Sequence, residues 1–527
     1  MRSCCLLVLA FPLFFQTQTL SGQDPTDQDS LVLIQDLRFS SDFEATQFRK
    51  LLAGEEVVFE ALMAINLEAR AQNVQLDKQM FFNEIGQLKQ ISSATGSGEL
   101  KYYKQIYDHV HERFFQKYEL SHYFNEVFSN GTYNCVSGTA IYALIFEELD
   151  IAYSIKETPT HVYIVLESNG NQYLLETTDP TGKFNKFSKN FKSHFIRELE
   201  EAKLISSQEV QSSNTEALFE KYYFTDINLT LTQLVGVQYW NDAVYKFRKE
   251  DYDGAIHALQ KCYLLYPNDK VKEMLLASLG IAISKTSYSI FEEVSYLASL
   301  SRFSEPEVSD VQLKNEFLRL NAYQLIDQGN QTLYTRSYNY LMAQVSRKSL
   351  RSEIDFVYNY ERARLLHNRG RYRTAIKYAE QAFDLKPANL DAETLFLSTL
   401  SQYLQYSNDQ QESYNMLDSL VSSHGSLMEN NKFGGLFLDF TLIQMADLFG
   451  ENKKTEGSTF KDKFENLYDE NPGYQVNKDL IGHAYSRAAV YYFRRGYYTS
   501  AKKILQKGMS YAPYNHELKT RMRAIND

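Results

Sequence analysis

The spacing of apolar residues predicts helices over most of the first 120 residues. At about residues 41–71, 76–91 and 99–118, apolar side chains recur three or four positions apart, which is the period of an amphipathic helix. The polar, glycine-containing stretch at residues 92–98 is typical of a loop. A further helix of mixed charge is expected at residues 185–204.

The pattern changes at residues 130–183. Asn134 can accept a hydrogen bond from an unpaired amide of a first helical turn, so it predicts the start of a helix over about residues 135–149. The small residues that follow Cys135 would let this helix lie close against a sheet. Two apolar runs at residues 161–166 and 172–178 come next, and the Asn-Gly pair between them predicts a hairpin.

The length of the hairpin loop decides which side chains share a face of the two strands. A three-residue loop pairs Ser168 with Gln172 and puts Asp179 directly opposite His161. A two-residue loop pairs His161 with Thr178 instead and turns Asp179 to the other face. The sequence leaves both registers open.

Three reactive side chains stand in this segment in the order Cys135, His161 and Asp179. A thiol in the first turn of a helix feels the positive end of the helix dipole, which favours the thiolate. A base must take the proton of a neutral thiol, and a third group must hold that base in the right tautomer. Cys135 is therefore the candidate nucleophile, His161 the candidate base and Asp179 the candidate orienting group.

The order and spacing of these residues resemble the transglutaminase-like superfamily of papain-type folds. The resemblance covers about residues 40–205, and it rests on the strings Asn134-Cys135-Val136-Ser137, Thr160-His161-Val162 and Thr178-Asp179-Pro180. It implies an α+β domain in which the Cys opens a helix and the His and Asp lie on neighbouring strands. It also implies cleavage or exchange of amide bonds through a thioester, although some members of the superfamily have lost activity and serve as scaffolds.

One departure from the superfamily concerns the residues after the His. Many members carry an aromatic residue there, often as His-Ala-Trp, whereas this chain has His161-Val162-Tyr163. A side-chain donor for an oxyanion is not evident, although Asn125, Asn130 and Asn134 are near in sequence. The backbone N–H of Cys135 would supply one donor in any case.

The second half of the chain contains repeats. Three windows share an aromatic residue, an alanine three positions later and a proline fifteen positions after the aromatic residue, and they resemble the tetratricopeptide pattern. These residues are Tyr252, Ala255 and Pro267; Tyr372, Ala375 and Pro387; and Tyr498, Ala501 and Pro513. Small residues let paired helices approach, and the proline ends the second helix of each pair. Cys262 falls where the pattern requires a small residue, so we expect it in the core.

The first 22 residues resemble a secretory signal peptide, with Arg2 before an apolar stretch at residues 4–15 and small residues at Ser21 and Gly22. Export to the periplasm or the extracellular space is therefore expected, as in exported proteins of bacterial type. Removal of the signal peptide leaves Cys135 and Cys262 as the remaining cysteines, and two cysteines do not make a disulfide framework. No later stretch is apolar enough to predict a membrane span.

Five segments are predicted along the chain. They are a signal peptide at 1–22, a flexible acidic and polar lead at 23–38, an α+β transglutaminase-like domain at 39–205, a polar linker at 206–215 and an all-α tetratricopeptide-like superhelix at 216–527.

Charge and composition narrow the function classes. The net charge is −11 and no basic run is visible, which argues against a nucleic-acid partner. No phosphate-binding loop, dinucleotide fingerprint or zinc-ligand spacing is present, so we expect neither a cofactor nor a metal. His109 and His111 stand two residues apart on a predicted helix and would not share a face.

Two functions are consistent with these patterns. The first is an exported Cys-His-Asp amide-bond hydrolase or acyltransferase that works through a thioester and binds a protein or peptide partner through its repeats. The alternative is a non-catalytic scaffold whose first domain keeps the fold without the activity. The three reactive residues together favour the enzyme.

Overall fold

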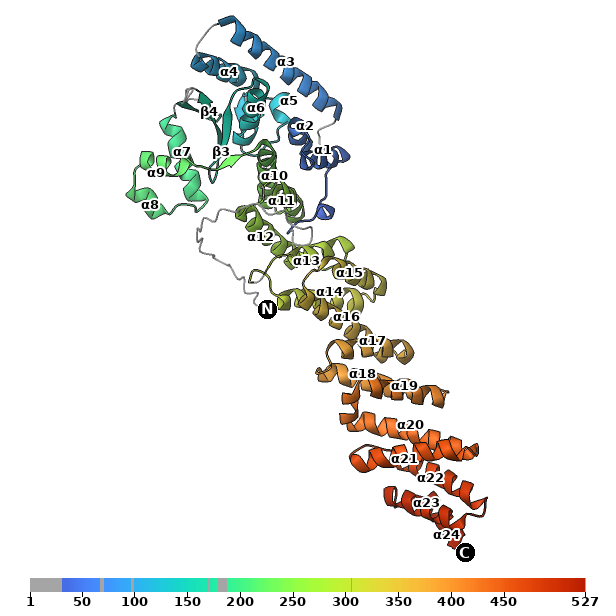
Figure 1. Ribbon diagram of the computed structural model, residues 1–527. Coiled ribbons are helices and arrows are strands. Elements are labelled where there is room, and N and C mark those ends of the chain that lie inside the picture. The colour runs from blue at the N-terminus through green and yellow to red at the C-terminus, as the bar shows by residue number, and fades with distance from the viewer. Residues whose placement is uncertain are drawn as a thin grey trace. The chain divides into compact units, whose positions relative to one another are not determined.

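The computed structural model describes residues 31–66, 71–95, 99–168, 171–178, 187–304 and 306–526. Its internal contacts divide the chain into two compact units, the first ending at Arg347 and the second comprising Lys348–Asp527 (Figure 1). Within the predicted linker at residues 206–215, Ser207–Ser212 form a helix that belongs to the first unit. The predicted signal peptide lies outside the described residues.

The first unit opens with helices that pack around an aromatic core. They are the short turn η1 (Ile34–Asp36), α1 (Asp42–Leu52), α2 (Val58–Ala64), α3 (Ala71–Thr95) and α4 (Glu99–Phe114). The single helix predicted at residues 41–71 is interrupted because the chain turns at Gly54, whose φ of +80° suits glycine. Phe59 stacks on Phe81 at 5.6 Å and meets Phe124 edge-on at 5.7 Å, which ties α2, α3 and the following loop together.

A four-stranded antiparallel sheet in the order β5-β4-β3-β6 forms the centre of this unit. Its strands are β3 (Tyr153–Glu157), β4 (Val162–Ser168), β5 (Asn171–Leu175) and β6 (Asn228–Leu229). A separate parallel pair, β1 (Lys117–Tyr118) and β2 (Thr132–Tyr133), flanks the short helix α5 (Glu126–Ser129) and leads into α6 (Cys135–Glu148). The predicted helix after Asn134 and the predicted hairpin are both present.

Helices cover the sheet on both faces (Figure 1). Helix α6 packs on β3 and β4. Gly138 permits this approach, because a Cβ there would lie 2.9 Å from Thr177 Oγ1. Alternate side chains of β4 point away from α6, and Tyr163 and Val165 pack in a cluster with Phe195 and Tyr223. That cluster involves α7 (Lys189–Glu201) and α9 (Thr215–Tyr223), with α8 (Ser207–Ser212) between them, and β6 follows α9 in the chain and pairs with β3.

From Leu231 onward, every element in the described part of the chain is helical. The first unit continues with α10 (Leu231–Arg248), α11 (Tyr252–Leu265), α12 (Asp269–Lys285), η2 (Phe291–Glu293), α13 (Val294–Leu300), α14 (Asp310–Asn321), η3 (Ala322–Asp327) and α15 (Gln331–Gln344). Residues 31–38 of the predicted flexible lead are anchored on these helices. Asp36 forms an ion pair with Arg302, and both side chains are 6% exposed.

The second unit is a stack of helices, most of which pack on the next helix along the chain (Figure 1). They are α16 (Lys348–Asn368), α17 (Tyr372–Leu385), α18 (Leu390–Gln405), α19 (Gln410–Ser423), η4 (Gly425–Glu429), α20 (Asn431–Gly450), α21 (Lys454–Glu470), α22 (Lys478–Phe493), α23 (Tyr498–Tyr511) and α24 (His516–Asn526). Among the described residues, α20 is the one helix long and apolar enough to cross a membrane, and 67% of its apolar window is buried inside the protein. This burial is what a core helix requires.

The three predicted repeat windows coincide with helix pairs. Tyr252, Tyr372 and Tyr498 are the first residues of α11, α17 and α23, and the prolines follow the ends of these helices. Cys262 is fully buried in α11, as its place in the pattern predicted. The helices between the windows fill the gaps without carrying the same residues.

Candidate functional site

Cys135 is the first residue of α6, and its neighbours determine where that helix begins. The Asn134 side chain accepts hydrogen bonds from the backbone N–H groups of Val136 and Ser137, both at 3.0 Å. Ser137 Oγ accepts one from the Asn134 N–H at 2.9 Å, which completes a reciprocal cap. The thiol therefore lies at the positive end of the helix dipole, and the residue is 9% exposed.

The predicted base meets this thiol. His161 directly precedes β4, and its side chain hydrogen-bonds with Cys135, a contact that contributes to its raised pKa. Its Nε2 lies 2.8 Å from Oε2 of Glu176. The imidazole is also flanked by the rings of Phe191 and Tyr223, at centroid distances of 5.7 Å and 6.0 Å. His161 is thus in contact with a thiol on one side and a carboxylate on the other.

Glu176 is held by hydrogen bonds at both carboxylate oxygens. Oε2 accepts from His161 and from the Tyr223 hydroxyl. Oε1 accepts from the backbone N–H of Thr178 at 2.8 Å and from its hydroxyl at 2.6 Å. A buried carboxylate needs such partners, because an unpaired one would carry a large desolvation cost.

The electrostatics of the pair favour the charged forms. Burial by itself would lower the pKa of His161, but the charge of Glu176 and the hydrogen bonds with Cys135 and Glu176 outweigh it and raise that pKa well above its ordinary value. Burial by itself would raise the pKa of Glu176, and the charge of His161 with the hydrogen bonds from His161, Thr178 and Tyr223 lowers it instead. The site therefore stabilises an imidazolium next to a carboxylate.

The hairpin register explains why Glu176 occupies this position. Ser168 pairs with Asn171, so the loop has two residues rather than three. Continued beyond the ladder, this register puts Glu176 opposite Tyr163, on the face that His161 shares. Asp179, the orienting group predicted from the sequence, lies outside the described residues. The sequence interpretation missed Glu176, although the two-residue alternative contained the signal that would have identified it.

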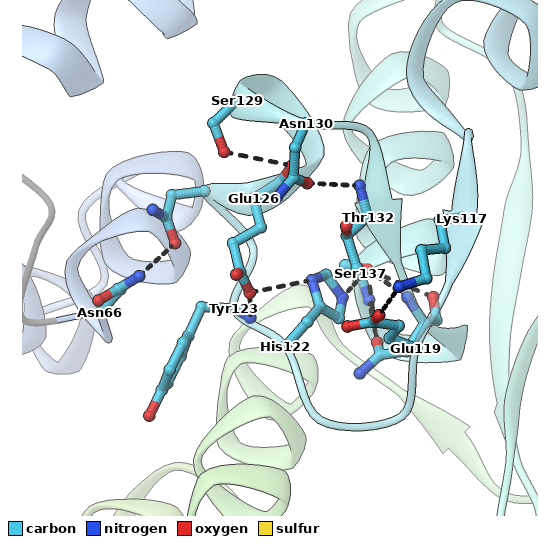
Figure 2. Close-up of polar contacts among 12 residues, drawn as sticks. Asn66, Lys117, Glu119, His122, Tyr123, Glu126, Ser129, Asn130, Thr132 and Ser137 are labelled. Atoms are coloured by element: carbon cyan, nitrogen blue, oxygen red, sulfur yellow. Dashed lines mark hydrogen bonds and ion pairs between the residues drawn. The ribbon is translucent and has the colours of Figure 1, made fainter.

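The three asparagines considered as oxyanion donors are engaged in holding the loop before Cys135. Asn134 Nδ2 donates to the Leu120 carbonyl at 3.1 Å, in addition to capping α6. Asn125 accepts from Asn66 at 2.9 Å, and Asn130 accepts from the Thr132 N–H at 2.9 Å (Figure 2). Of the three, only Asn134 uses its amide nitrogen, the atom that an oxyanion donor needs, in these contacts, whereas Asn125 and Asn130 accept through Oδ1.

His122 also contacts the first turn of α6, through Ser137 (Figure 2). Its Nε2 lies 2.8 Å from Ser137 Oγ, and its Nδ1 lies 3.7 Å from Oε2 of Glu126. Burial lowers the pKa of His122 to about 4, so the ring is neutral near pH 7. A neutral ring can accept a hydrogen bond from the Ser137 hydroxyl at Nε2. Nδ1 would then carry the hydrogen, and at 3.7 Å from Glu126 it has no hydrogen-bond partner among the described residues.

A cavity of about 570 Å³ lies beside the site, between α4 and the β1–β2 pair. It is lined by Asp108, His111, Glu112, Phe115, Gln116, Tyr118 and Tyr133. Tyr118 connects the cavity to the thiol, because burial and then the charge of Cys135 raise the pKa of its hydroxyl.

His109 and His111 contact different neighbours. His109 Nε2 contacts Glu84 at 3.2 Å, whereas the ring of His111 packs on Tyr107 at a centroid distance of 4.2 Å. Throughout the described ranges, no group of three or more His, Cys, Asp or Glu side chains is arranged to hold a metal ion.

Comparison with known proteins identifies one part of the chain. The tetratricopeptide repeat family matches residues 357–389, which comprise most of α16 and α17 and the turn after them. This match coincides with the second of the three windows and is typical of protein-interaction modules. No curated protein matches the chain.

Proposed function

We propose that the α+β part of the first unit is a thiol-dependent amide-bond enzyme and that the helical repeats bind its protein partner or substrate. The observation that carries the proposal is the position of His161, which contacts the Cys135 thiol and the Glu176 carboxylate while all three side chains are buried. A nucleophile, a base and an orienting group are the three parts that covalent acyl transfer requires.

The proposed reaction follows from this arrangement. His161 takes the thiol proton, and Cys135 Sγ attacks the carbonyl carbon of an amide. The C–N bond then breaks, and the leaving nitrogen takes the proton from the His161 imidazolium, which leaves a thioester. Water or an amine, deprotonated by His161, displaces the thiolate and releases an acid or a new amide. Glu176 keeps Nε2 engaged throughout and stabilises the imidazolium.

The backbone N–H of Cys135 is the proposed donor to the oxyanion. It belongs to the first turn of α6, where amides have no acceptor within the helix. The Tyr118 hydroxyl is a candidate for a second donor, because burial and the charge of Cys135 keep it protonated. Both groups would act on the negative charge that develops during attack.

Alkylation of the thiol against pH tests this proposal. We expect iodoacetamide to label Cys135 readily at pH 6, well below the pKa of about 8.5 of a free thiol. Cys262 is the internal control, because it is fully buried and burial raises the pKa of its thiol far above the ordinary value. If Cys135 is labelled as slowly as Cys262 at pH 6, the proposal of a thiol-dependent enzyme is overturned.

A non-catalytic scaffold is the second candidate. It is favoured by the burial of the site, since Cys135 is 9% exposed and His161 and Glu176 are each 7% exposed. Affinity capture with the Cys135→Ala chain should recover a protein partner through the repeats under either proposal. If repeated affinity capture recovers no protein partner, a purely structural role for the repeats is favoured.

Export is a further part of the proposal, and it rests on the sequence of residues 1–22. Mass spectrometry of the chain expressed with these residues would find a new N-terminus near residue 23 in an exocytoplasmic fraction. An intact N-terminus in the cytoplasm would contradict it.

A further inference from the structure

We propose that the cavity beside Cys135 binds a cationic side chain, an ammonium or a guanidinium, of the polypeptide on which the thiol acts. This inference rests on the proposed function and names the substrate class for that site. The cavity combines aromatic walls, negative charge that is only partly compensated, and a lining residue two positions before the thiol, and each of these observations contributes separately.

The walls are three aromatic rings in fixed orientations. Phe115 stacks on Tyr133 with centroids 4.2 Å apart, and Tyr118 meets Tyr133 edge-on at 5.8 Å. The electron-rich faces of such rings attract cations, and several rings around one space bind them best. A volume of about 570 Å³ is ample for the end of a lysine or arginine side chain.

The backbone around these rings leaves little freedom to close the cavity. Tyr118 and Tyr133 are paired residues of the β1–β2 ladder. The Gln116 N–H donates to the Gly131 carbonyl at 2.8 Å, and a Cβ at Gly131 would lie 2.4 Å from the Gln116 side chain. Gly131 also has a φ of +72°, so glycine is needed here for both reasons.

The rim carries negative charge that is only partly compensated. Asp108 and Glu112 stand one turn apart on α4, and both line the cavity. Lys104 pairs with Asp108 at 2.5 Å, but Glu112 forms no ion pair with any described residue. Burial lowers the pKa of His111 to about 4, so this ring adds no positive charge that would repel a cation.

The cavity is also in the right place to select a substrate. Tyr133 is two residues before Cys135, and Tyr118 is close enough for the thiolate charge to raise the pKa of its hydroxyl, after burial. A cationic side chain held in the cavity that these rings line would bring a neighbouring amide of the same chain toward the start of α6. The selection would therefore act on the residue beside the bond that is attacked.

Two alkylating probes of equal size test the inference on the full chain. One carries an iodoacetamide group on an aminoethyl tail, which is an ammonium at pH 7, and the other carries the neutral propyl tail. We expect Cys135 to react about tenfold faster with the cationic probe. Glu112→Gln should remove most of this preference, whereas Glu148→Gln, at the opposite end of α6, should leave it unchanged and so control for overall charge.

The outcomes separate this inference from the proposed function. Rapid labelling of Cys135 with equal rates for both probes would overturn the cation site and leave the nucleophile intact. If Cys135 does not label, calorimetry of the Cys135→Ser chain still measures how tightly the cavity binds N-acetyl-lysine methylamide and its norleucine analogue. Equal affinity for the lysine and norleucine derivatives would overturn the cation site. If free butylamine binds as tightly as the lysine derivative, the proposal that the cavity recognises a polypeptide would be overturned. Should Glu112→Gln fail to fold, Asp108→Asn serves in its place.

Discussion

His161 Nε2 and Glu176 Oε2 lie 2.8 Å apart, and both side chains are 6% exposed. An ion pair withdrawn from water to this extent depends on both partners, because removing one leaves the other charge buried and uncompensated. The pair therefore connects the chemistry of the site to the stability of the domain.

Replacing Glu176 by Gln should slow alkylation of Cys135 at pH 6 by about tenfold or more, because the imidazolium that stabilises the thiolate loses its counter-charge. The change should also lower the free energy of unfolding by about 3 kcal/mol. Rates of labelling and urea denaturation measure the two effects. Asp179→Asn is the matched comparison, and a larger loss of reactivity there than in Glu176→Gln would return the orienting role to Asp179.

The pair also predicts how stability depends on pH. The pKa of His161 is raised on folding, so its contribution is complete below about pH 6.5, the value in the unfolded chain, and is lost as pH rises through the folded pKa. The pKa of Glu176 is lowered on folding, so its contribution is complete above about pH 4.3 and is lost as pH falls through the folded pKa.

The measurement is the difference in unfolding free energy between the natural chain and His161→Gln. We expect this difference to be large at pH 5–6 and to shrink only as pH rises through the raised pKa of His161. A difference that is already lost between pH 6 and 7 would show that the imidazole titrates normally.

A second buried ion pair attaches the N-terminal helix to the helical part of the first unit. Glu44 on α1 contacts Lys261 on α11 at 2.6 Å and accepts a hydrogen bond from the Tyr239 hydroxyl at 2.9 Å. We expect Glu44→Ala to cost about 3–5 kcal/mol, because Lys261 would be left unpaired. The double variant Glu44→Ala with Lys261→Met should recover part of that loss, and equal costs for the single and double variants would contradict this account. Urea denaturation of the natural chain and of both variants measures these costs.

Gly138 tests the close approach of α6 to the sheet. A Cβ at this position would lie 2.9 Å from Thr177 Oγ1 and 3.0 Å from Thr177 Cβ, so Gly138→Ala should destabilise the first unit by about 1–3 kcal/mol. Gly280→Ala in α12 is the control, because a Cβ there meets nothing within 4 Å. Alanine is the better helix former, so the control should gain about 0.5–1 kcal/mol. Equal changes in unfolding free energy for Gly138→Ala and Gly280→Ala would show that α6 can move away from Thr177 to accommodate the added methyl group.

Local signals in the sequence determined where several elements begin and end. Asn134 predicts the start of α6 because a cap depends only on the few residues that follow it. The Asn-Gly pair predicts the hairpin, and the tyrosines and prolines of the windows predict α11, α17 and α23, for the same reason. The buried Cys262 follows from the repeat pattern alone.

The tertiary structure decided what depends on contacts between distant residues. The hairpin register was open in the sequence, and a difference of one residue in the loop selects Glu176 as the partner of His161. The packing of the sheet also depends on distant residues, because Phe195 and Tyr223 pack on Tyr163 and Val165 of β4. Hydrophobic burial and ion pairing act through space, so Asp36 is held by Arg302, although 266 positions of chain separate them.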